Sequence, residues 1–310
     1  MGHIPVLYDE CLNGLNINPN GVYLDMTVGG FGHGRGICEK LSADGMYIGF
    51  DKDIEAIKRG ELEKNNFNCK IEFIHKDFKD FAKCLDSMGV GNIDGCLIDL
   101  GVSSFQLDES ERGFSFMNDG PLDMRMDQTQ VISAKDIVNN YQQKELFNII
   151  KKYGEDKFAA NIAKKIVEYR VNVKLFETTG ELSEVVKTAI PKKFWIKGKN
   201  PATRTFQALR IEVNSELDDL SDCINALIDR LAKGGRLAII SFHSLEDRIV
   251  KEAYKSHMKH CECPKDFPIC ICGISPIVKS ISGNFQKALD AETQNNTRSR
   301  SAKLRIIEKL

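Results

Sequence analysis

Long apolar runs are missing from this sequence of 310 residues. No stretch approaches the roughly 20 consecutive apolar residues that a membrane-spanning helix needs. The first residues, Met1 to Val6, do not join a basic segment to an apolar run, so no secretory signal is predicted. We therefore expect a cytoplasmic protein that has no membrane partner.

An excess of charge of one sign is also missing. The 43 Lys and Arg residues nearly balance the 44 Asp and Glu residues, and the formal net charge is -1. Such a chain has no overall attraction for nucleic acid, so an RNA partner would have to be held by local basic clusters. The candidates for such contacts are Lys192, Lys193, Lys197, Lys199, Arg204, Arg210, Arg298, Arg300, Lys303 and Arg305.

Internal repeats and low-complexity linkers are absent as well, and what remains is an alternation of strand-like and helical patterns. Short apolar runs rich in β-branched residues indicate parallel βαβ units. The predicted strands are Val22 to Met26, Met46 to Phe50, Ile71 to Ile74, Cys96 to Leu100 and, after a long gap, Arg236 to Phe242. A further strand, Leu304 to Ile307, is expected to close the sheet edge. We predict an α/β fold with a doubly wound, Rossmann-like sheet.

The gap between the fourth and fifth strands has helical periodicity. Apolar residues recur at helical spacing from Phe158 to Tyr169 and again from Leu182 to Ala189, and Thr178 with Glu181 forms a capping box for the second pattern. A third apolar stripe, from Phe206 to Leu231, predicts one or two helices that cover the sheet and stop at two glycines, 234 and 235. We expect an inserted helical domain over 113–201, between sheet-domain parts 1–112 and 202–310.

A glycine-rich loop follows the first predicted strand. Its sequence, from Gly29 to Gly34, allows close approach of the backbone to a ligand, and the helix after it offers free N–H groups. Asp51 ends the second predicted strand, where an acid can accept hydrogen bonds from both ribose hydroxyls of a nucleoside. Loop and acid together predict a nucleoside cofactor.

These residues leave two nucleoside cofactors open, a nicotinamide dinucleotide and S-adenosylmethionine. No three glycines of the loop have the G-x-G-x-x-G spacing of a dinucleotide site, which disfavours a nicotinamide cofactor. The common methyltransferase form, D-x-G-x-G-x-G counted from Asp25, is also broken, because Thr27 and Phe31 stand at two glycine positions. The loop alone does not decide between the two cofactors.

Longer blocks downstream carry a resemblance to one family. They are Asp94 to Asp108, Glu111 to Phe116, Gly120 to Asp127, Pro201 to Arg210, Ser241 to Arg248 and Arg298 to Arg305, together with His3 to Leu7. In this order they resemble the bacterial ribosomal small-subunit RNA cytosine-N4 methyltransferases, over nearly the whole chain. The resemblance implies a class I S-adenosylmethionine-dependent methyltransferase with a helical insertion, and that insertion is expected to recognise RNA.

The resemblance also implies a set of site residues. In the family, the methionine part of S-adenosylmethionine lies against Phe31, Gly32 and His33, and Asp51 holds the ribose. Phe78 lies beside the adenine. Asp99 and Gln106 complete the contacts with the donor. The implied reaction moves a methyl group to the exocyclic N4 of a cytosine in 16S ribosomal RNA, either free or within the assembled subunit.

Little acid–base machinery is needed for this reaction, because the sulfonium methyl is already activated and alignment supplies much of the rate. The amino lone pair is delocalised into the ring, so Asp99 is expected to orient the amino group or accept its proton. Phe105, Phe114 and Phe116 either receive the target base or pack in the interior. Two alternatives are a non-catalytic RNA-binding or ribosome assembly factor and a nicotinamide-dependent reductase.

Six of the ten cysteines are scattered singly through apolar segments, as expected for buried thiols. The other four lie close together with two histidines: His257, His260, Cys261, Cys263, Cys270 and Cys272. This group is rich enough in nitrogen and sulfur for a tetrahedral zinc ion, but C-x-C pairs are less diagnostic than C-x₂-C pairs. Zinc, free thiols and an artefactual disulfide all remain open, and no residue is assigned as a metal ligand.

Overall fold

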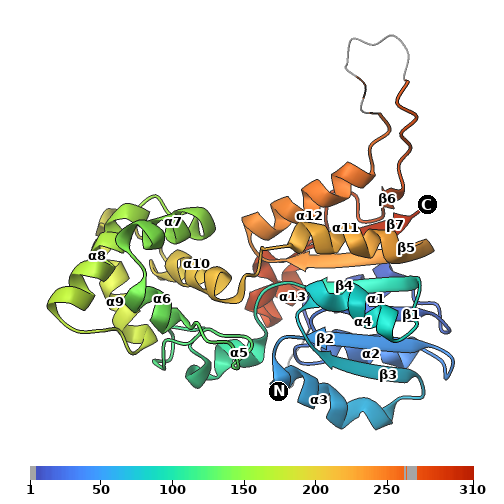
Figure 1. The fold of residues 1–310 in the computed structure, drawn as a ribbon, viewed down its shortest axis with the longest axis horizontal. Coiled ribbons are helices and arrows are strands. Elements are labelled where there is room, and N and C mark those ends of the chain that lie inside the picture. The colour runs from blue at the N-terminus through green and yellow to red at the C-terminus, as the bar shows by residue number, and fades with distance from the viewer. Residues whose placement is uncertain (1–4, 262, 264–270) are drawn as a thin grey trace. The chain divides into compact units, whose positions relative to one another are not determined.

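A computed structural model describes residues 5–261, 263 and 271–310. The chain forms two compact units, one built from the residues up to Gly101 together with Asp218–Leu310, and the other from Val102–Leu217 (Figure 1). None of the helices in the described part of the chain is long and apolar enough to cross a membrane.

The first unit contains a seven-stranded sheet in the order β3-β2-β1-β4-β5-β7-β6. Its strands are β1 (Val22–Asp25), β2 (Met46–Asp51), β3 (Lys70–His75), β4 (Ile93–Asp99), β5 (Leu231–Ser241), β6 (Val278–Ser280) and β7 (Lys303–Lys309). The first five strands are parallel, whereas β7 is antiparallel to both β5 and β6. The predicted α/β doubly wound sheet is confirmed.

The edge of the sheet differs from the prediction. β7 pairs with β5 on one side and with β6 on the other, so the strand around Leu304 does not close the sheet. The edge strand is β6, which the sequence analysis missed. Only Val278 of its three residues is buried, so it lacks the apolar pattern by which strands are found.

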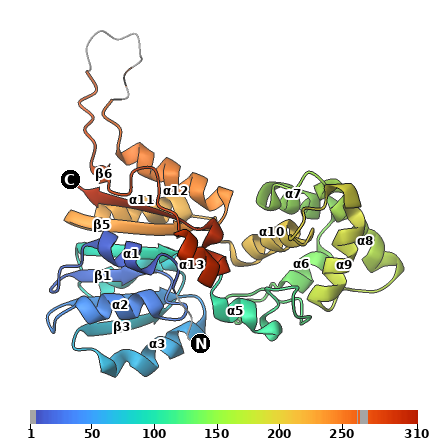
Figure 2. The same cartoon turned by 180° about the vertical axis from the view of Figure 1, so that it is seen from behind.

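Helices cover both faces of this sheet. The α-helices of this unit are α1 (Tyr8–Leu15), α2 (Gly32–Lys40), α3 (Ile54–Glu63), α4 (Phe81–Ser87), α11 (Leu220–Arg230), α12 (Ser244–His257) and α13 (Asp290–Asn295). The pair α1 and α2 shares a hydrophobic core with the strands, and the pair α11 and α12 packs on β5 (Figures 1 and 2). The strand residues Leu24, Ile48 and Ile98 are therefore fully buried, as expected for parallel strands that are covered on both faces.

The second unit is helical. Its helices are α5 (Ser104–Asp108), α6 (Ala134–Asn140), α7 (Gln143–Gly154), α8 (Ala159–Asn172), α9 (Thr179–Ala189) and α10 (Thr203–Asn214). The predicted capping box of Thr178 and Glu181 starts α9. Ile162 and Leu182, from the two predicted periodic patterns, are both fully buried.

The third apolar stripe forms two helices, and only one of them covers the sheet. The backbone at Ser215 and Asp219 is left-handed, which separates α10 from α11. Because α10 packs on α6 and α7, it belongs to the helical unit, and only α11 packs on β5. The helical unit accordingly spans 102–217, a wider range than the expected insertion over 113–201.

The prediction that the two glycines after this stripe end a helix is wrong. The helix α11 ends at Arg230, and β5 already begins at Leu231. Gly234 has a φ of 80°, and the register of β5 with β4 shifts between Ile93 and Gly95. The glycines therefore lie in an irregularity of the strand, where a left-handed residue is needed.

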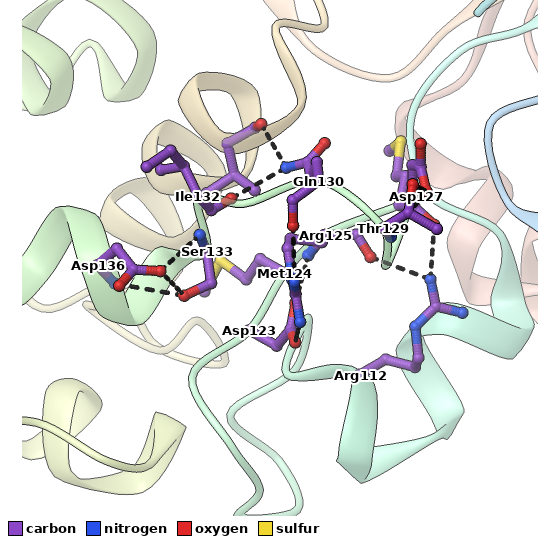
Figure 3. Close-up of polar contacts among 12 residues, drawn as sticks. Arg112, Asp123, Met124, Arg125, Asp127, Thr129, Gln130, Ile132, Ser133 and Asp136 are labelled. Carbon is purple, nitrogen blue, oxygen red and sulfur yellow. Dashed lines mark hydrogen bonds and ion pairs between the residues drawn. The ribbon is translucent and has the colours of Figure 1, made fainter. Parts of the chain in front are cut away.

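One motif in the helical unit forms a dense polar network (Figure 3). The Arg112 guanidinium donates to the carbonyl oxygens of Arg125 and Met126, both at 3.0 Å. Arg125 in turn forms an ion pair with Asp123 at 2.7 Å and donates to the Gln130 carbonyl oxygen. The charged residues of the block from Gly120 to Asp127 thus fix the path of their own loop.

Two other motifs meet in the first unit. Asp247 lies in the first turn of α12, and it accepts hydrogen bonds from Lys303 at 2.7 Å and from Arg305 at 2.8 Å, both on β7. Burial opposes ionisation of Asp247, but these hydrogen bonds hold its pKa below the usual range. Lys303 and Arg305 therefore serve the architecture, which weakens their candidacy as RNA contacts.

Replacement of this carboxylate gives the first prediction. The change Asp247→Asn leaves two cations of β7 without their counter-charge, so we expect it to lower the free energy of unfolding by about 3 kcal/mol at neutral pH. The loss should shrink as the pH falls, because stability from a depressed pKa disappears when the carboxylate is protonated. Urea unfolding of Asp247→Asn, with the exposed Glu252→Gln of the same helix as the control, measures this difference. Equal stability of the two variants would contradict the prediction.

Candidate functional site

The order of the strands locates the site. β1 lies between β2 and β4, so the chain leaves β1 at the point where the strand order reverses. In open α/β sheets, ligands bind outside the carboxyl ends of the strands at this switch point. The loop from Met26 to Phe31 and the ends of β2 and β4 therefore form the candidate site.

Both neighbouring strands hold the glycine loop. The N–H of Gly29 donates to Oδ2 of Asp51 at 2.8 Å, and the N–H of Asp99 donates to Oγ1 of Thr27 at 2.7 Å. Continuing the strand registers from Asp25 places Asp51 and Asp99 level with Thr27 on either side. With neighbouring strands about 4.8 Å apart, the two acids face the site from opposite sides of the loop at a spacing of about 10 Å.

The two departures from the methyltransferase loop pattern have physical explanations. Thr27 replaces a glycine because its hydroxyl ties the loop to β4. Phe31 adopts a left-handed backbone with a φ of 60°, and its fully buried ring packs against Tyr47 and Phe73. Only the backbone of Phe31 is thus available to a ligand at its predicted position.

The N-terminal segment covers the end of this loop. A Cβ atom on Gly32 would lie 2.3 Å from Cγ of Pro5, so only glycine fits there. His33 is buried, its Nε2 lies 3.0 Å from the carbonyl oxygen of Val6, and its ring stacks on Tyr8. This contact gives the His3 to Leu7 motif a structural role, although His3 and Ile4 themselves lie outside the described residues.

Asp51 is fixed in orientation. Its Oδ1 accepts the N–H of Asp53 at 2.8 Å, while Oδ2 accepts the N–H of Gly29. Burial raises the pKa of Asp51 to about 6, although these two N–H groups lower it. Each oxygen retains a lone pair for a further donor such as a ribose hydroxyl.

Asp99 has the most perturbed carboxylate of the site. Burial, followed by the nearby Asp25 and Glu246, raises its pKa to about 8. Its Oδ1 is shielded from solvent and has no hydrogen-bond partner within the described residues. A buried acceptor of this kind needs a donor or a cation, so it marks a ligand-binding position.

His33 faces this carboxylate. Its Nδ1 lies 3.8 Å from Oδ2 of Asp99, which is too long for a direct hydrogen bond. The carbonyl oxygen of Val6 can only accept, so Nε2 carries the hydrogen, and in the neutral ring the lone pair of Nδ1 faces Asp99. His33 is therefore a neighbour of Asp99 that its own contacts with Val6 and Tyr8 hold in place.

Asp25 was missed by the sequence analysis as a contributor to the site. It is buried at the end of β1 and accepts a hydrogen bond from the Tyr47 hydroxyl at 2.9 Å. Burial raises its pKa to about 6, against hydrogen bonds from Thr27 and Tyr47 that lower it. The available clue was that β1, β2 and β4 each end in an aspartate, since parallel strands bring their carboxyl ends to one edge.

Phe78 follows β3 and is partly buried. Lys52 lies 6.0 Å from the centre of its ring and also forms an ion pair with Asp77 at 2.8 Å. Lys52 follows Asp51 at the end of β2, so this ion pair joins the end of β2 to the segment after β3. The position beside an adenine remains a prediction for Phe78.

The remaining predicted residues belong to the helical unit. Gln106 is buried, and its Oε1 accepts the N–H of Ser103 in a capping box that starts α5. Phe114 is also buried, and Phe116 packs edge-on against Phe206 at 5.0 Å. Packing within the unit therefore accounts for Phe116 and makes it a weaker candidate for the target base than the partly buried Phe105.

The histidine of the block from Ser241 to Arg248 is structural. His243 is the N-cap residue of α12, and Glu246 accepts the N–H groups of Phe242 and His243 at 2.8 and 3.1 Å. This arrangement is a capping box.

Comparison with known proteins identifies the family. A model of the MraW methylase family matches residues 1–310. The chain belongs to the MraW methylase family. It is 51% identical over 308 residues to the Ribosomal RNA small subunit methyltransferase H of Clostridioides difficile (strain 630), and the match covers 99% of each chain. A protein of the same name from Clostridium botulinum (strain 657 / Type Ba4) is 48% identical, again with 99% of each chain covered.

Among solved structures, the methylase is similar to an rRNA methylase from Streptococcus thermophilus, with a TM-score of 0.39, 13% identity and coverage of 98% and 93% of the two chains. The order and direction of the strands define the fold class independently of this likeness. Family membership confirms the prediction of an S-adenosylmethionine-dependent methyltransferase.

The residues at the switch point fit this methyl donor. S-adenosylmethionine carries a cationic sulfonium, an ammonium group and a ribose diol. The shielded Oδ1 of Asp99 suits an N–H donor or a cation, and the fixed oxygens of Asp51 suit a diol. The bound group supplies an electrophilic methyl, and the chain supplies the acceptors that hold it.

The raised pKa of Asp99 gives the second prediction. The folded protein holds this proton more tightly than the unfolded chain, so the wild type loses stability as the pH rises from about 4 to about 8. The variant Asp99→Asn cannot ionise, and without the donor we expect it to be more stable than the wild type above pH 8 by more than about 1 kcal/mol, the equivalent of one pKa unit.

Urea unfolding across this pH range measures the difference, and Asp44→Asn in an exposed loop is the control. Parallel stability curves for the wild type and Asp99→Asn would show that Asp99 is not a buried acid.

Proposed function

We propose that this methylase transfers a methyl group from S-adenosylmethionine to the exocyclic N4 of a cytosine in 16S ribosomal RNA, in the cytoplasm. The observation that carries the proposal is the solvent-shielded Oδ1 of Asp99, which has no hydrogen-bond partner among the described residues, at the switch point of a methyltransferase sheet. The names of the relatives, ribosomal RNA small subunit methyltransferases, support the substrate.

Asp99 is the proposed catalytic residue. A carboxylate with a pKa near the operating pH can accept the amino hydrogen as the nitrogen forms its bond to the methyl group, and can then release the proton to solvent. His33, which Val6 and Tyr8 hold in place, lies beside this carboxylate. Asp51 and the loop from Gly29 to His33 hold the donor, with Phe78 beside the adenine and Gln106 as a further contact.

The helical unit offers a surface suited to single-stranded RNA. Trp195 is 40% exposed, and its Nε1 donates to the carbonyl oxygen of Ile190 at 2.9 Å, so the ring is held in one orientation. An aromatic ring that is exposed and fixed can stack on a base. We include this ring in the proposed RNA surface.

Four lysines lie close to Trp195 in the sequence. Lys192, Lys193, Lys197 and Lys199 are all exposed, and none of them forms an ion pair with an acidic side chain of the described residues. Lys157 lies 4.1 Å from the ring centre of Phe194, next to Trp195. Unpaired lysines around a fixed aromatic ring suit a phosphate backbone with unstacked bases.

Mass mapping of ribosomal RNA tests the reaction. Cells without this protein should lack one methyl group on a cytosine of 16S RNA, and the wild-type gene should restore it while Asp99→Asn should not. Restoration by Asp99→Asn would remove Asp99 from the mechanism. An unchanged methylation map in the deletion strain would favour the non-catalytic assembly factor. The same assay on purified free 16S RNA and on isolated small subunits identifies the form that is methylated.

Binding of the donor gives the third prediction. Asp51 ends β2, and the N–H of Gly29 in the loop fixes its carboxylate for the ribose of the donor. We therefore expect Asp51→Ala to weaken S-adenosylmethionine binding by at least about 100-fold, which corresponds to about 2.7 kcal/mol. Isothermal titration measures this change, with circular dichroism as the check on folding and Asp44→Ala as the control. Equal affinities of the wild type and Asp51→Ala for S-adenosylmethionine would contradict the prediction.

The RNA surface gives the fourth prediction. The double variant Lys197→Ala/Lys199→Ala should weaken RNA binding and reduce the slope of log affinity against log salt by about 1 to 1.5, since each phosphate contact with single-stranded RNA contributes about 0.7. Lys164→Ala/Lys165→Ala is the matched control, because it removes two lysines of the same unit that already pair with Glu168. Equal salt slopes for the two double variants would place the RNA elsewhere.

A further inference from the structure

A cluster of three cysteines lies outside the methyl-transfer site. Cys261, Cys263 and Cys272 belong to the long segment between α12 and β6, and their sulfur atoms all lie within 4.8 Å of one another. In both ribbon views the two arms of this segment run side by side away from the sheet (Figures 1 and 2). At the base, the N–H of Ile277 donates to the carbonyl oxygen of His257 at 3.0 Å.

We propose that Cys261, Cys263 and Cys272 bind a structural Zn²⁺ ion through their thiolates. Zinc–sulfur bonds of about 2.3 Å at tetrahedral angles place neighbouring sulfur atoms about 3.8 Å apart. The sulfur atoms of Cys261 and Cys272 are 3.8 Å apart. A disulfide would require about 2.05 Å, and it would leave the third thiol of the cluster unused.

Backbone N–H groups point at two of these sulfurs. The N–H of Cys263 donates to Sγ of Cys261 at 3.3 Å, and the N–H of Ile271 donates to Sγ of Cys263 at 3.4 Å. Hydrogen bonds of this kind stabilise thiolates, which are the form that binds zinc, and they fix the ligands in place. Each thiol releases its proton as its bond to the metal forms.

A bound metal ion would cross-link the two arms of a segment whose described residues lack a hydrophobic core. None of its described residues from Met258 to Ile277 is buried, and Ile271 is 74% exposed. The described residues of this segment form no helix or strand, so neither secondary structure nor a hydrophobic core among them holds the two arms together. A metal bound by both arms would close the loop in the way that metals stabilise other small coreless segments.

The other members of the predicted cluster contribute less or cannot be placed. Nδ1 of His257 lies 2.9 Å from the carbonyl oxygen of Ala253, within α12, and His257 is not part of the three-sulfur group. Cys270 lies outside the described residues, and in sequence it forms a second C-x-C pair with Cys272. It is thus available in the chain as a fourth thiol.

Metal analysis of the full chain, purified under reducing conditions without chelators, tests the proposal. After incubation with excess Zn²⁺ and desalting, mass spectrometry should find about one zinc per chain. The triple variant Cys261→Ser/Cys263→Ser/Cys272→Ser should retain less than about a tenth of that amount, while Cys84→Ser, at a cysteine outside the cluster, should keep it. Circular dichroism checks that the variants fold.

A second readout uses the thiols themselves. In the zinc-loaded protein a thiol reagent should modify at least three cysteines fewer than after treatment with a strong chelator. Less than half an equivalent of zinc, iron in its place, metal retained by the triple variant, or thiol reactivity that the chelator does not change would each overturn the proposal. None of these measurements depends on methyl transfer, so they are independent of the proposed reaction.

Discussion

The loop after β1 is fastened to the strands on both of its sides, and the site depends on this constraint. Asp51 accepts from Gly29 on one side, and the Asp99 N–H donates to Thr27 on the other. Both contacts follow from the strand registers, which bring the two acids level with the loop. Loop, acids and sheet therefore form one rigid frame, and rigid frames are what alignment-driven chemistry requires.

This frame keeps three carboxylates under conditions that oppose their ionisation. Burial raises the pKa values of Asp25 and Asp51 to about 6 and that of Asp99 to about 8. Hydrogen bonds offset part of this burial for Asp25 and Asp51, whereas Oδ1 of Asp99 has no partner among the described residues. A cationic methyl donor bound beside Asp99 would stabilise its carboxylate, which explains why the fold tolerates the arrangement.

Many charged residues of the family motifs form ion pairs and hydrogen bonds that hold the chain together. Arg112, Asp123 and Arg125 fix one loop of the helical unit, and Asp247 joins α12 to β7. Arginine and aspartate are also residue types that would suit RNA binding or catalysis. The side chains and carbonyl groups that they contact therefore indicate their roles. The lysines from Lys192 to Lys199 lack such partners in the described chain, and this difference separates them from Lys303 and Arg305.

The sequence by itself determined the parallel strands of the sheet, the family, and Asp51 and Asp99 as acids at strand ends, because periodicity, turn residues and long motif blocks are local properties of the chain. It did not determine that α10 joins the helical unit or that the glycines at 234 and 235 lie inside β5. It also left β6 hidden, since three largely exposed residues have no pattern. The roles of Thr27 and Phe31 and the proximity of Cys261, Cys263 and Cys272 were decided by tertiary structure, because each depends on contacts between residues that are apart in sequence or on backbone geometry that composition does not encode.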